Sequence, residues 1–315
     1  MLWEDYSCGG AFAMRNLKKF GHWYLLGLLI LGAFFVWSEI FFLEAQRGRL
    51  LLHVFDVGQG DAIFIRAPNG NQVLIDGGPD TTVLTKLGQT LPWWDRSIDL
   101  LLLTHPHADH LDGLLEVLER YAVGRVVESG VNHSIPEYQI WHDAIAARHI
   151  PVAMARNGVV IHLGAETSIK VLAPLGSFLD ASPRNIHAAS VVGELAFASS
   201  TVLFMADAEA ALERELIRRG EIRPVDVLKV GHHGSKTSTS EALLGASRPR
   251  LAVISVGRKN RYGHPTQEVL DRLERFGIQT YRTDQDGDVV LVSNGRTFAP
   301  LLPEATVFRR GRQAD

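Results

Sequence analysis

The chain has 315 residues, 46% hydrophobic and 21% charged, which excludes a disordered protein and allows one large globular domain with a short extension. The formal net charge of −3 excludes a global attraction to polyanions, so any nucleic-acid contact requires a local basic patch. The single cysteine, Cys8, cannot form an internal disulfide, and a metal site would therefore use histidine and carboxylate ligands.

An apolar segment dominates the N-terminal part of the chain. No Asp, Glu, Lys or Arg occurs from Phe20 to Ser38, and the stretch Trp23–Trp37 is apolar on every helical face. With Ile40–Leu43 added, the segment reaches the roughly 20 residues that cross a bilayer core. We therefore predict a cytoplasmic segment over residues 1–20 and a transmembrane anchor over residues 21–43.

Charged residues on either side of this segment predict its orientation. Arg15, Lys18 and Lys19 precede it, whereas Glu39 and Glu44 follow it. The positive-inside rule then places the N-terminus in the cytoplasm and the rest of this single-pass protein outside the cytoplasmic membrane. A cleaved signal peptide, which would also export the catalytic part, and a buried core helix are the alternatives.

Beyond residue 48, strand-like and helix-like patterns alternate. Short apolar or period-two runs predict strands at Leu50–Val57, Ala62–Arg66, Gln72–Ile75, Ile98–Thr104, Ser168–Leu172, Val191–Phe197, Thr201–Met205, Val225–Val230, Leu251–Val256 and Val289–Val292. Helical spacing predicts helices at Leu111–Tyr121, Pro136–Arg148, Ala208–Arg219, Ser240–Ala246 and Thr266–Phe276. The pattern indicates an α/β domain over residues 48–300 with two sheets and outer helices, followed by a loose tail at 301–315.

The run His105-Pro106-His107-Ala108-Asp109-His110 carries the strongest chemical signal. It follows the apolar strand Leu100–Thr104, and side chains two apart at a strand end project to the same side, so His105 and His107 can hold one metal. Asp109 and His110 enter the next helix and can reach a second metal. Imidazole with carboxylate suits zinc or manganese. The alternative is a loop of four solvated polar residues.

Two later strand ends carry further ligand types. Asp207 follows Val202–Met205, and His232-His233-Gly234 follows Val227–Val230. A carboxylate between two cations can bind both, and another imidazole completes the second site. Taken alone, Asp207 could instead cap the helix that begins near Ala208.

These stretches resemble the metallo-β-lactamase superfamily, and more closely the extracellular hydrolase domain of the ComEC family of competence proteins. The resemblance covers about residues 50–293 and rests on Phe55–Ala62, Leu74–Gly78, Thr104–His110, Leu228–Ser238, Ser255–Gly257 and Asn260–Pro265. It implies a metallo-β-lactamase-like αββα sandwich with two metal ions at one edge between the sheets.

The resemblance also implies roles for individual residues. His105 and His107 would hold the first metal, Asp109 and His110 the second, and Asp207 would bridge them. Either His232 or His233 would complete the second site. Asp76 and Asp61 would support the ligands from outside the metal shell. Asp109 and Asp207 are the candidate catalytic carboxylates.

This sequence departs from the family pattern in two places. A further histidine often serves the first metal before the strand that leads to the bridging Asp, and here the segment Arg184–Ser190 offers only His187, which is either that ligand or a surface loop residue. Ala206 stands where the family usually has Gly. Occupancy of the first metal site therefore depends on His187.

Basic and hydroxyl side chains follow the later strands. The predicted substrate contacts are Ser235, Lys236, Arg258, Arg261 and His264, and Lys229 and Lys259 are expected in the same loops. Such a patch can hold phosphodiester oxygens. Solvated surface charge is the alternative for each lysine and arginine.

We therefore predict a membrane-anchored hydrolase with two divalent metal ions, zinc or manganese. Its expected substrate is a phosphodiester, DNA in the case of a nuclease, attacked by an acidified water. The competing functions are a two-metal hydrolase of another ester or amide, such as a phosphocholine ester, a lactone or a β-lactam, and a non-catalytic binding module. One anchor cannot form a channel, so DNA transport would need a separate channel protein. The sequence does not indicate an oligomeric state.

Overall fold

The computed structural model describes residues 10–45, 48–179 and 181–301, and it divides into a unit up to residue 47 and a unit from residue 48 onward. The first unit is the helix α1, Gly10–Ala45. Within it, Gly21–Ser38 has a mean hydropathy of 1.5, and none of this window is buried. By length and composition, this window is a candidate membrane span. Of the predicted tail at 301–315, residues 302–315 lie outside the described residues.

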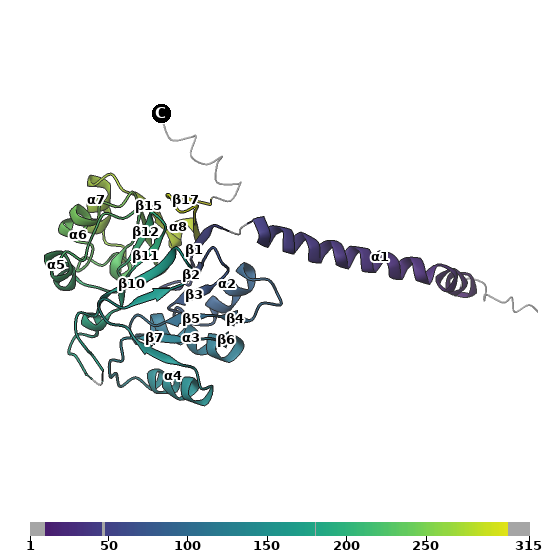
Figure 1. The fold of residues 1–315 in the computed structure, drawn as a ribbon, viewed down its shortest axis with the longest axis horizontal. Helices are drawn as coiled ribbons and strands as arrows, with labels where there is room; N and C mark the ends of the chain where they lie inside the picture. The colour runs from purple at the N-terminus through teal and green to yellow at the C-terminus, as the bar shows by residue number, and fades with distance from the viewer. Residues whose placement is uncertain (1–9, 46–47, 180, 302–315) are drawn as a thin grey trace, which may run out of the picture. The chain divides into compact units, whose positions relative to one another are not determined.

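The second unit contains two large sheets (Figure 1). The eight-stranded sheet has the order β17-β16-β1-β2-β3-β5-β7-β8 and consists of β1 Leu50–Val54, β2 Ile63–Arg66, β3 Gln72–Ile75, β5 Leu100–Leu102, β7 Val126–Glu128, β8 Val152–Met154, β16 Val289–Ser293 and β17 Phe298–Pro300. The seven-stranded sheet has the order β15-β14-β13-β12-β11-β10-β9 and consists of β9 Val160–His162, β10 Thr167–Ala173, β11 Val192–Phe197, β12 Ser200–Phe204, β13 Val227–Lys229, β14 Leu251–Ile254 and β15 Gln279–Arg282. A small pair joins β4 Ser97–Ile98 to β6 Ala122–Val123.

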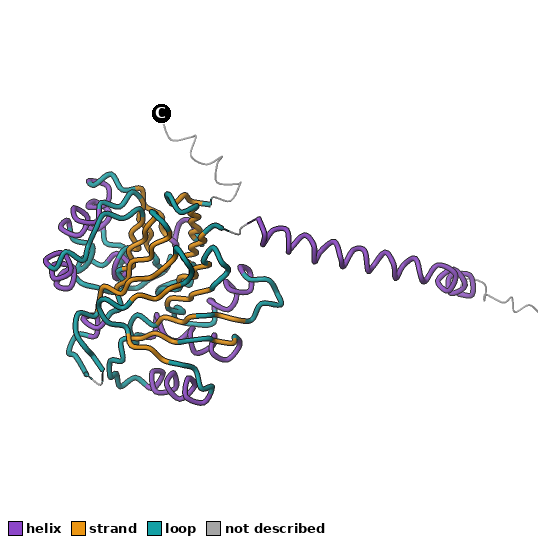
Figure 2. Tube along the Cα trace, viewed as in Figure 1, coloured by secondary structure: helices purple, strands orange, loops and turns teal. Residues whose placement is uncertain are grey.

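Helices cover the outer faces of the sheets (Figure 2). The α-helices of this unit are α2 Thr82–Thr90, α3 Ala108–Arg120, α4 Pro136–Ala147, α5 Ala210–Arg218, α6 Glu241–Ser247, α7 Gln267–Arg275 and α8 Thr283–Asp286, and the 3₁₀ turns are η1 Ile186–Ala189 and η2 Gly231–Gly234. Helices α2–α4 lie over the eight-stranded sheet, and α5–α7 lie over the seven-stranded sheet.

Alternating apolar side chains hold the four layers together. In β2, Ile63 and Ile65 join a buried cluster that also contains residues of the other sheet, such as Val202 and Val227. Phe64, between them, joins a second cluster beneath α2, α3 and α4. A third cluster lies beneath α5, α6 and α7. A one-residue slip of β2 would exchange these two faces, so the core fixes the register. The predicted αββα sandwich is confirmed.

The structure shifts several predicted boundaries. Helix α3 begins at Ala108, so Asp109 and His110 lie in its first turn rather than before it. The predicted strand Ile98–Thr104 divides into β4 and β5, and its last residues leave the sheet. Lys229, expected beside the substrate contacts, is the last residue of β13 and is 1% exposed, so it belongs to the predicted strand Val225–Val230 and not to a loop. Asp207 does not cap the following helix, because Glu209 occupies the N-cap position of α5.

A close backbone contact positions the Asp-Gly-Gly turn after β3. A Cβ atom on Gly113 would lie 1.9 Å from the carbonyl oxygen of Gly77, and one on Gly77 would lie 2.4 Å from the amide nitrogen of Leu114. Only glycine permits this approach of the turn to α3. The contact brings Asp76 against the helix that carries Asp109 and His110.

Candidate metal centre

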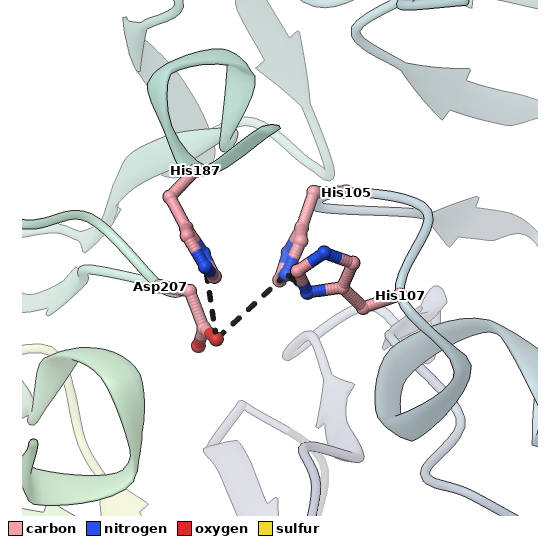
Figure 3. A group of neighbouring side chains, drawn as sticks. All are labelled: His105, His107, His187 and Asp207. Atoms are coloured by element: carbon pink, nitrogen blue, oxygen red, sulfur yellow. Dashed lines mark hydrogen bonds and ion pairs between the residues drawn. The ribbon is translucent and has the colours of Figure 1, made fainter. Parts of the chain in front are cut away.

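Ligand-type side chains from separate elements lie close together, and Figure 3 shows four of them, His105, His107, His187 and Asp207. The run from His105 follows β5, Asp207 follows β12, and His232 and His233 follow β13. His187 comes from the turn η1, which precedes β11. Because β12 and β13 are parallel, their C-terminal ends meet at one edge of the seven-stranded sheet, opposite the end of β5.

The first group consists of His105, His107, His187 and Asp207. One ligand atom from each lies within 4.8 Å of all the others. His105 Nε2 lies 3.1 Å from His107 Nδ1, and Oδ2 of Asp207 lies 3.7 Å from His105 Nε2 and 3.8 Å from His187 Nδ1. His187 thus faces the same carboxylate oxygen as His105. Of the two interpretations of His187, a ligand of the first metal or a surface loop residue, this geometry favours the ligand.

The second group consists of Asp109, His110 and His233, whose ligand atoms also lie within 4.8 Å of one another. The other oxygen of Asp207, Oδ1, lies 3.6 Å from His110 Nε2 and 3.7 Å from His233 Nε2. Asp207 therefore turns one oxygen toward each group. His232, the residue before His233, lies on the side of the first group, with its Nε2 3.6 Å from Oδ2 of Asp207.

Four buried atoms of this cluster have no hydrogen-bond partner among the described residues, namely His110 Nε2, His187 Nδ1, His233 Nε2 and Asp207 Oδ1. A buried polar atom without a partner costs about 1–3 kcal/mol, and four of them in one place call for a ligand. Imidazole nitrogens and a carboxylate oxygen suit zinc or manganese. The residues present therefore fit divalent metal ions.

The charges around the cluster favour a cation. Burial lowers the pKa of His105 well below its usual value, and burial with the neighbouring His187 lowers the pKa of His107 to about 4, so both imidazoles are neutral, as a metal ligand must be. Burial opposes charge on His110 as well, yet Asp109, Asp76 and Asp207 together raise its pKa well above the usual value. The centre thus stabilises positive charge at this position.

Hydrogen bonds from outside the two groups orient the ligands. Asp76 Oδ2 lies 2.7 Å from His110 Nδ1, and Thr104 donates to the same carboxylate from its hydroxyl at 2.7 Å and its backbone N–H at 2.8 Å. The carbonyl oxygen of Ser255 lies 3.1 Å from His233 Nδ1. Each partner leaves the opposite ring nitrogen free for a metal.

Asp61 has a different partner. Its carboxylate forms a buried ion pair with Lys229 at 2.9 Å and lies 3.6 Å from His233 Nδ1. Lys229 therefore does not belong to a substrate patch, because its charge is satisfied inside the domain.

Four residues at the centre have left-handed backbone conformations: Asp76, Ala206, His232 and His233, with φ between 45° and 58°. This region is sparsely populated by residues other than glycine. It explains why a glycine suits the position before Asp207, which Ala206 occupies here at φ 45°.

The predicted substrate contacts are spread around the centre. His264 lies nearest, with its ring 5.9 Å from the ring of His232 and its Nδ1 buried without a partner among the described residues. Lys236 is exposed in the loop after η2, and Ser235 is 5% exposed beside Thr237. Arg258 donates to the carbonyl oxygen of Asp284 in α8, and Arg261 donates to the hydroxyl of its neighbour Tyr262, so both side chains have partners outside the metal centre.

Sequence patterns did not indicate His133. Its ring lies 6.1 Å from that of His107, and its Nδ1 is buried without a partner within the described ranges. Its only signal is its place after β7, at the same sheet edge as the run that follows β5.

The chain matches the model of the metallo-beta-lactamase superfamily over residues 55–258. It is 30% identical over 277 residues to ComE operon protein 3 of Bacillus subtilis, which covers 80% of this chain and 34% of that protein. It is 29% identical over 262 residues to recombination protein 2 of Haemophilus influenzae (79% and 30% covered) and 31% identical over 237 residues to competence protein ComA of Neisseria gonorrhoeae (74% and 31%). The chain thus spans about a third of the length of these relatives.

Solved structures share the fold at low sequence identity. The diiron β-hydroxylase CmlA of Streptomyces venezuelae matches with a TM-score of 0.51 and 17% identity, over 81% of this chain and 54% of that one. The metallo-beta-lactamase fold protein YhfI of Bacillus subtilis matches with a TM-score of 0.51 and 12% identity, over 78% of this chain and 100% of that one.

Proposed function

The chain belongs to the metallo-β-lactamase superfamily, and on that premise we propose that it is a membrane-anchored two-metal hydrolase that cleaves phosphodiesters outside the cytoplasmic membrane. One observation carries the proposal: the two oxygens of Asp207 face two separate groups of ligand-type side chains. A non-catalytic binding module would not need two such groups around a shared buried carboxylate.

His105, His107 and His187 would hold one ion, Asp109, His110 and His233 the other, and Asp207 both. When bound, the metal pair supplies a water of lowered pKa and Lewis-acid stabilisation of the charge that develops on phosphoryl oxygens. Asp76 fixes His110 in the orientation that presents its Nε2 to this site.

Asp109 is the more exposed of the two candidate catalytic carboxylates. Its side chain is 31% exposed, whereas that of Asp207 is 3% exposed. His233 Nε2 lies 3.4 Å from Asp109 Oδ2 and holds it at the rim of the centre. We assign to Asp109 the positioning of the attacking water at this rim.

We assign the substrate contacts to His264, Lys236 and Ser235, which lie near His232. An imidazole without a partner and an exposed ammonium group can bind and neutralise phosphate oxygens. DNA is the proposed substrate because the relatives carry competence and recombination names. Transport of DNA needs a channel, which we assign to a separate partner protein.

Helix α1 is the proposed anchor. Its window Gly21–Ser38 is uncharged, and Arg15, Lys18 and Lys19 precede it. The positive-inside rule then keeps the N-terminus in the cytoplasm and puts the metal centre outside.

The test measures the metal content of the purified full chain, followed by hydrolysis of bis-p-nitrophenyl phosphate, single- and double-stranded DNA, a lactone and a β-lactam. The proposal expects a transition metal and turnover of the phosphodiesters. His264→Ala should lower turnover of DNA, and His162→Ala, an exposed histidine on β9, is the matched control. Turnover of the lactone or β-lactam alone would reject the phosphodiesterase assignment.

A further inference from the structure

Two neighbouring tryptophans stand out on the surface of the second unit. Trp93 is 78% exposed, more than any other large hydrophobic side chain in the described part of the chain, and Trp94 is 42% exposed. Their rings are 5.5 Å apart and nearly perpendicular. Tryptophans bury large apolar areas when they can, so an exposed pair indicates a binding surface.

The loop that carries the pair is fixed to the sheet. Gln72, the first residue of β3, donates from its side chain to Asp95 at 2.6 Å and from its backbone N–H to Asp99 at 2.7 Å. The backbone N–H of Asp95 also donates to the carbonyl oxygen of Pro92. The tryptophans therefore project from an anchored turn.

This loop lies at the end of the sheet where the chain enters the domain, which we call the Gly48 end. In the strand register, Leu51 pairs with Arg66, and Arg66 pairs with Gln72. The backbone N–H of Gly48 donates to the carbonyl oxygen of Pro68, in the turn after Arg66. Strand β5 starts beside β3 at this end and runs toward His105, so the metal centre lies at the opposite end of the strands.

The Gly48 end also carries positive charge. Arg49, Arg96 and Arg125 are exposed, and Arg66 is partly exposed. Arg125 immediately precedes β7, and its carbonyl oxygen accepts from the backbone N–H of Leu101 in β5. The acidic residues of the tryptophan loop, Asp95 and Asp99, are occupied by Gln72.

We propose that the Gly48 end rests on the surface of the lipid bilayer, with Trp93 and Trp94 in the interfacial region and the arginines at anionic headgroups. Tryptophan prefers this region, and basic residues near a membrane are attracted to anionic lipids. Only residues 46 and 47 lie between Ala45, the last residue of α1, and Gly48, so the chain enters the domain at this end after it leaves the helix that contains the candidate span. This inference rests on the anchor of the proposed function. It holds the metal centre away from the lipid and open to the aqueous phase.

The experiment places a fluorescent label near the tryptophans. The full chain with Cys8→Ser receives a single cysteine at Gln89, exposed in α2 four residues before Trp93, and is reconstituted into nanodiscs with anionic lipid. Ser177, exposed in the segment that leads to His187, is the control position. Spin-labelled headgroups should quench a label at position 89 several-fold more strongly than one at position 177.

Variants then test the tryptophans themselves. Trp93→Ser, and Trp93→Ser with Trp94→Ser, should reduce quenching at position 89 toward that at position 177. Ile140→Ser, which removes a 54% exposed apolar side chain from α4, should not. Equal quenching at both positions, or quenching unchanged in the double variant, overturns the inference. Tryptophan-dependent dimers without lipid quenching overturn it in favour of a second copy. If the full chain does not stay with the nanodisc, the anchor fails and this inference fails with it.

Discussion

Asp76 Oδ2 lies 2.7 Å from Nδ1 of His110, so this buried carboxylate holds the ring with its other nitrogen toward Asp207. Asp76→Asn keeps the shape of the side chain but removes its charge. We expect metal affinity to fall about 10–100-fold, the usual effect of losing such a partner. Competition with a chelating dye measures it, and Asp288→Asn, a surface carboxylate paired with Lys86, is the control. Equal dissociation constants for wild type and Asp76→Asn would show that Asp76 does not support the ligand.

The ion pair between Lys229 and Asp61 predicts a structural effect. Both side chains are about 2% exposed and 2.9 Å apart. Lys229→Met leaves a buried carboxylate without its partner, and we expect a loss of about 3–5 kcal/mol in the free energy of unfolding. Lys229→Met with Asp61→Asn should recover part of this loss. Urea denaturation measures both variants, and a Lys229→Met protein as stable as wild type would contradict the expectation.

His187 determines whether the first group can hold its metal ion. Its Nδ1 lies 3.8 Å from Asp207, buried and without a partner in the described ranges. We expect His187→Ala to lose the ion of the first group and to retain that of the second, so the metal bound per chain falls by half. Elemental analysis after dialysis measures this ratio, with His162→Ala as control. Full retention of metal by His187→Ala would remove His187 from the ligand set.

His53, in β1, predicts a pH dependence outside the metal centre. Burial among Phe55 and Phe64 lowers the pKa of His53 from 6.5 to about 4, against the opposing charge of Asp288. The unfolded chain then binds the proton more readily than the folded one, so this group lowers stability as pH falls from 6.5 toward 4. The shift corresponds to about 3 kcal/mol at most.

The measurement compares unfolding of wild type and His53→Gln by urea between pH 4 and 7. Because other histidines titrate in the same range, the difference between the two proteins isolates His53. We expect wild type to lose more stability than His53→Gln on acidification. Parallel profiles would mean that His53 is not held in its neutral form.

The sequence predicted those parts of the site that a short segment contains. The run from His105 to His110 could be recognised because four ligand-type residues follow one apolar strand. Asp207 and His233 could be predicted as candidates because each follows a strand whose apolar pattern is clear. The choice between His232 and His233 could not be predicted, since left-handed backbone at both residues decides which ring faces Asp109.

Long-range pairing escaped the sequence patterns. Lys229 was expected beside the substrate contacts because its buried partner, Asp61, lies 168 positions away in the sequence. Short elements were missed as well. No helix was predicted at α2, because only Val83 and Leu87 show the apolar helical spacing, and the threonines and Gly88 have weak helix propensity. The three-residue strands β7, β8 and β9 are too short to show a period. Hydrogen bonding to neighbouring strands, and not their own sequence pattern, places these three strands in the sheets.

The shared carboxylate of Asp207 is the centre of this account. The most direct measurement is therefore the metal content of the full chain and of Asp207→Ala, together with their hydrolysis of bis-p-nitrophenyl phosphate. We predict that the wild-type chain binds two divalent ions and turns over the phosphodiester, whereas Asp207→Ala loses metal from both groups and its hydrolysis. A wild-type chain that binds no transition metal, or an Asp207→Ala protein that retains full hydrolysis, would contradict the account.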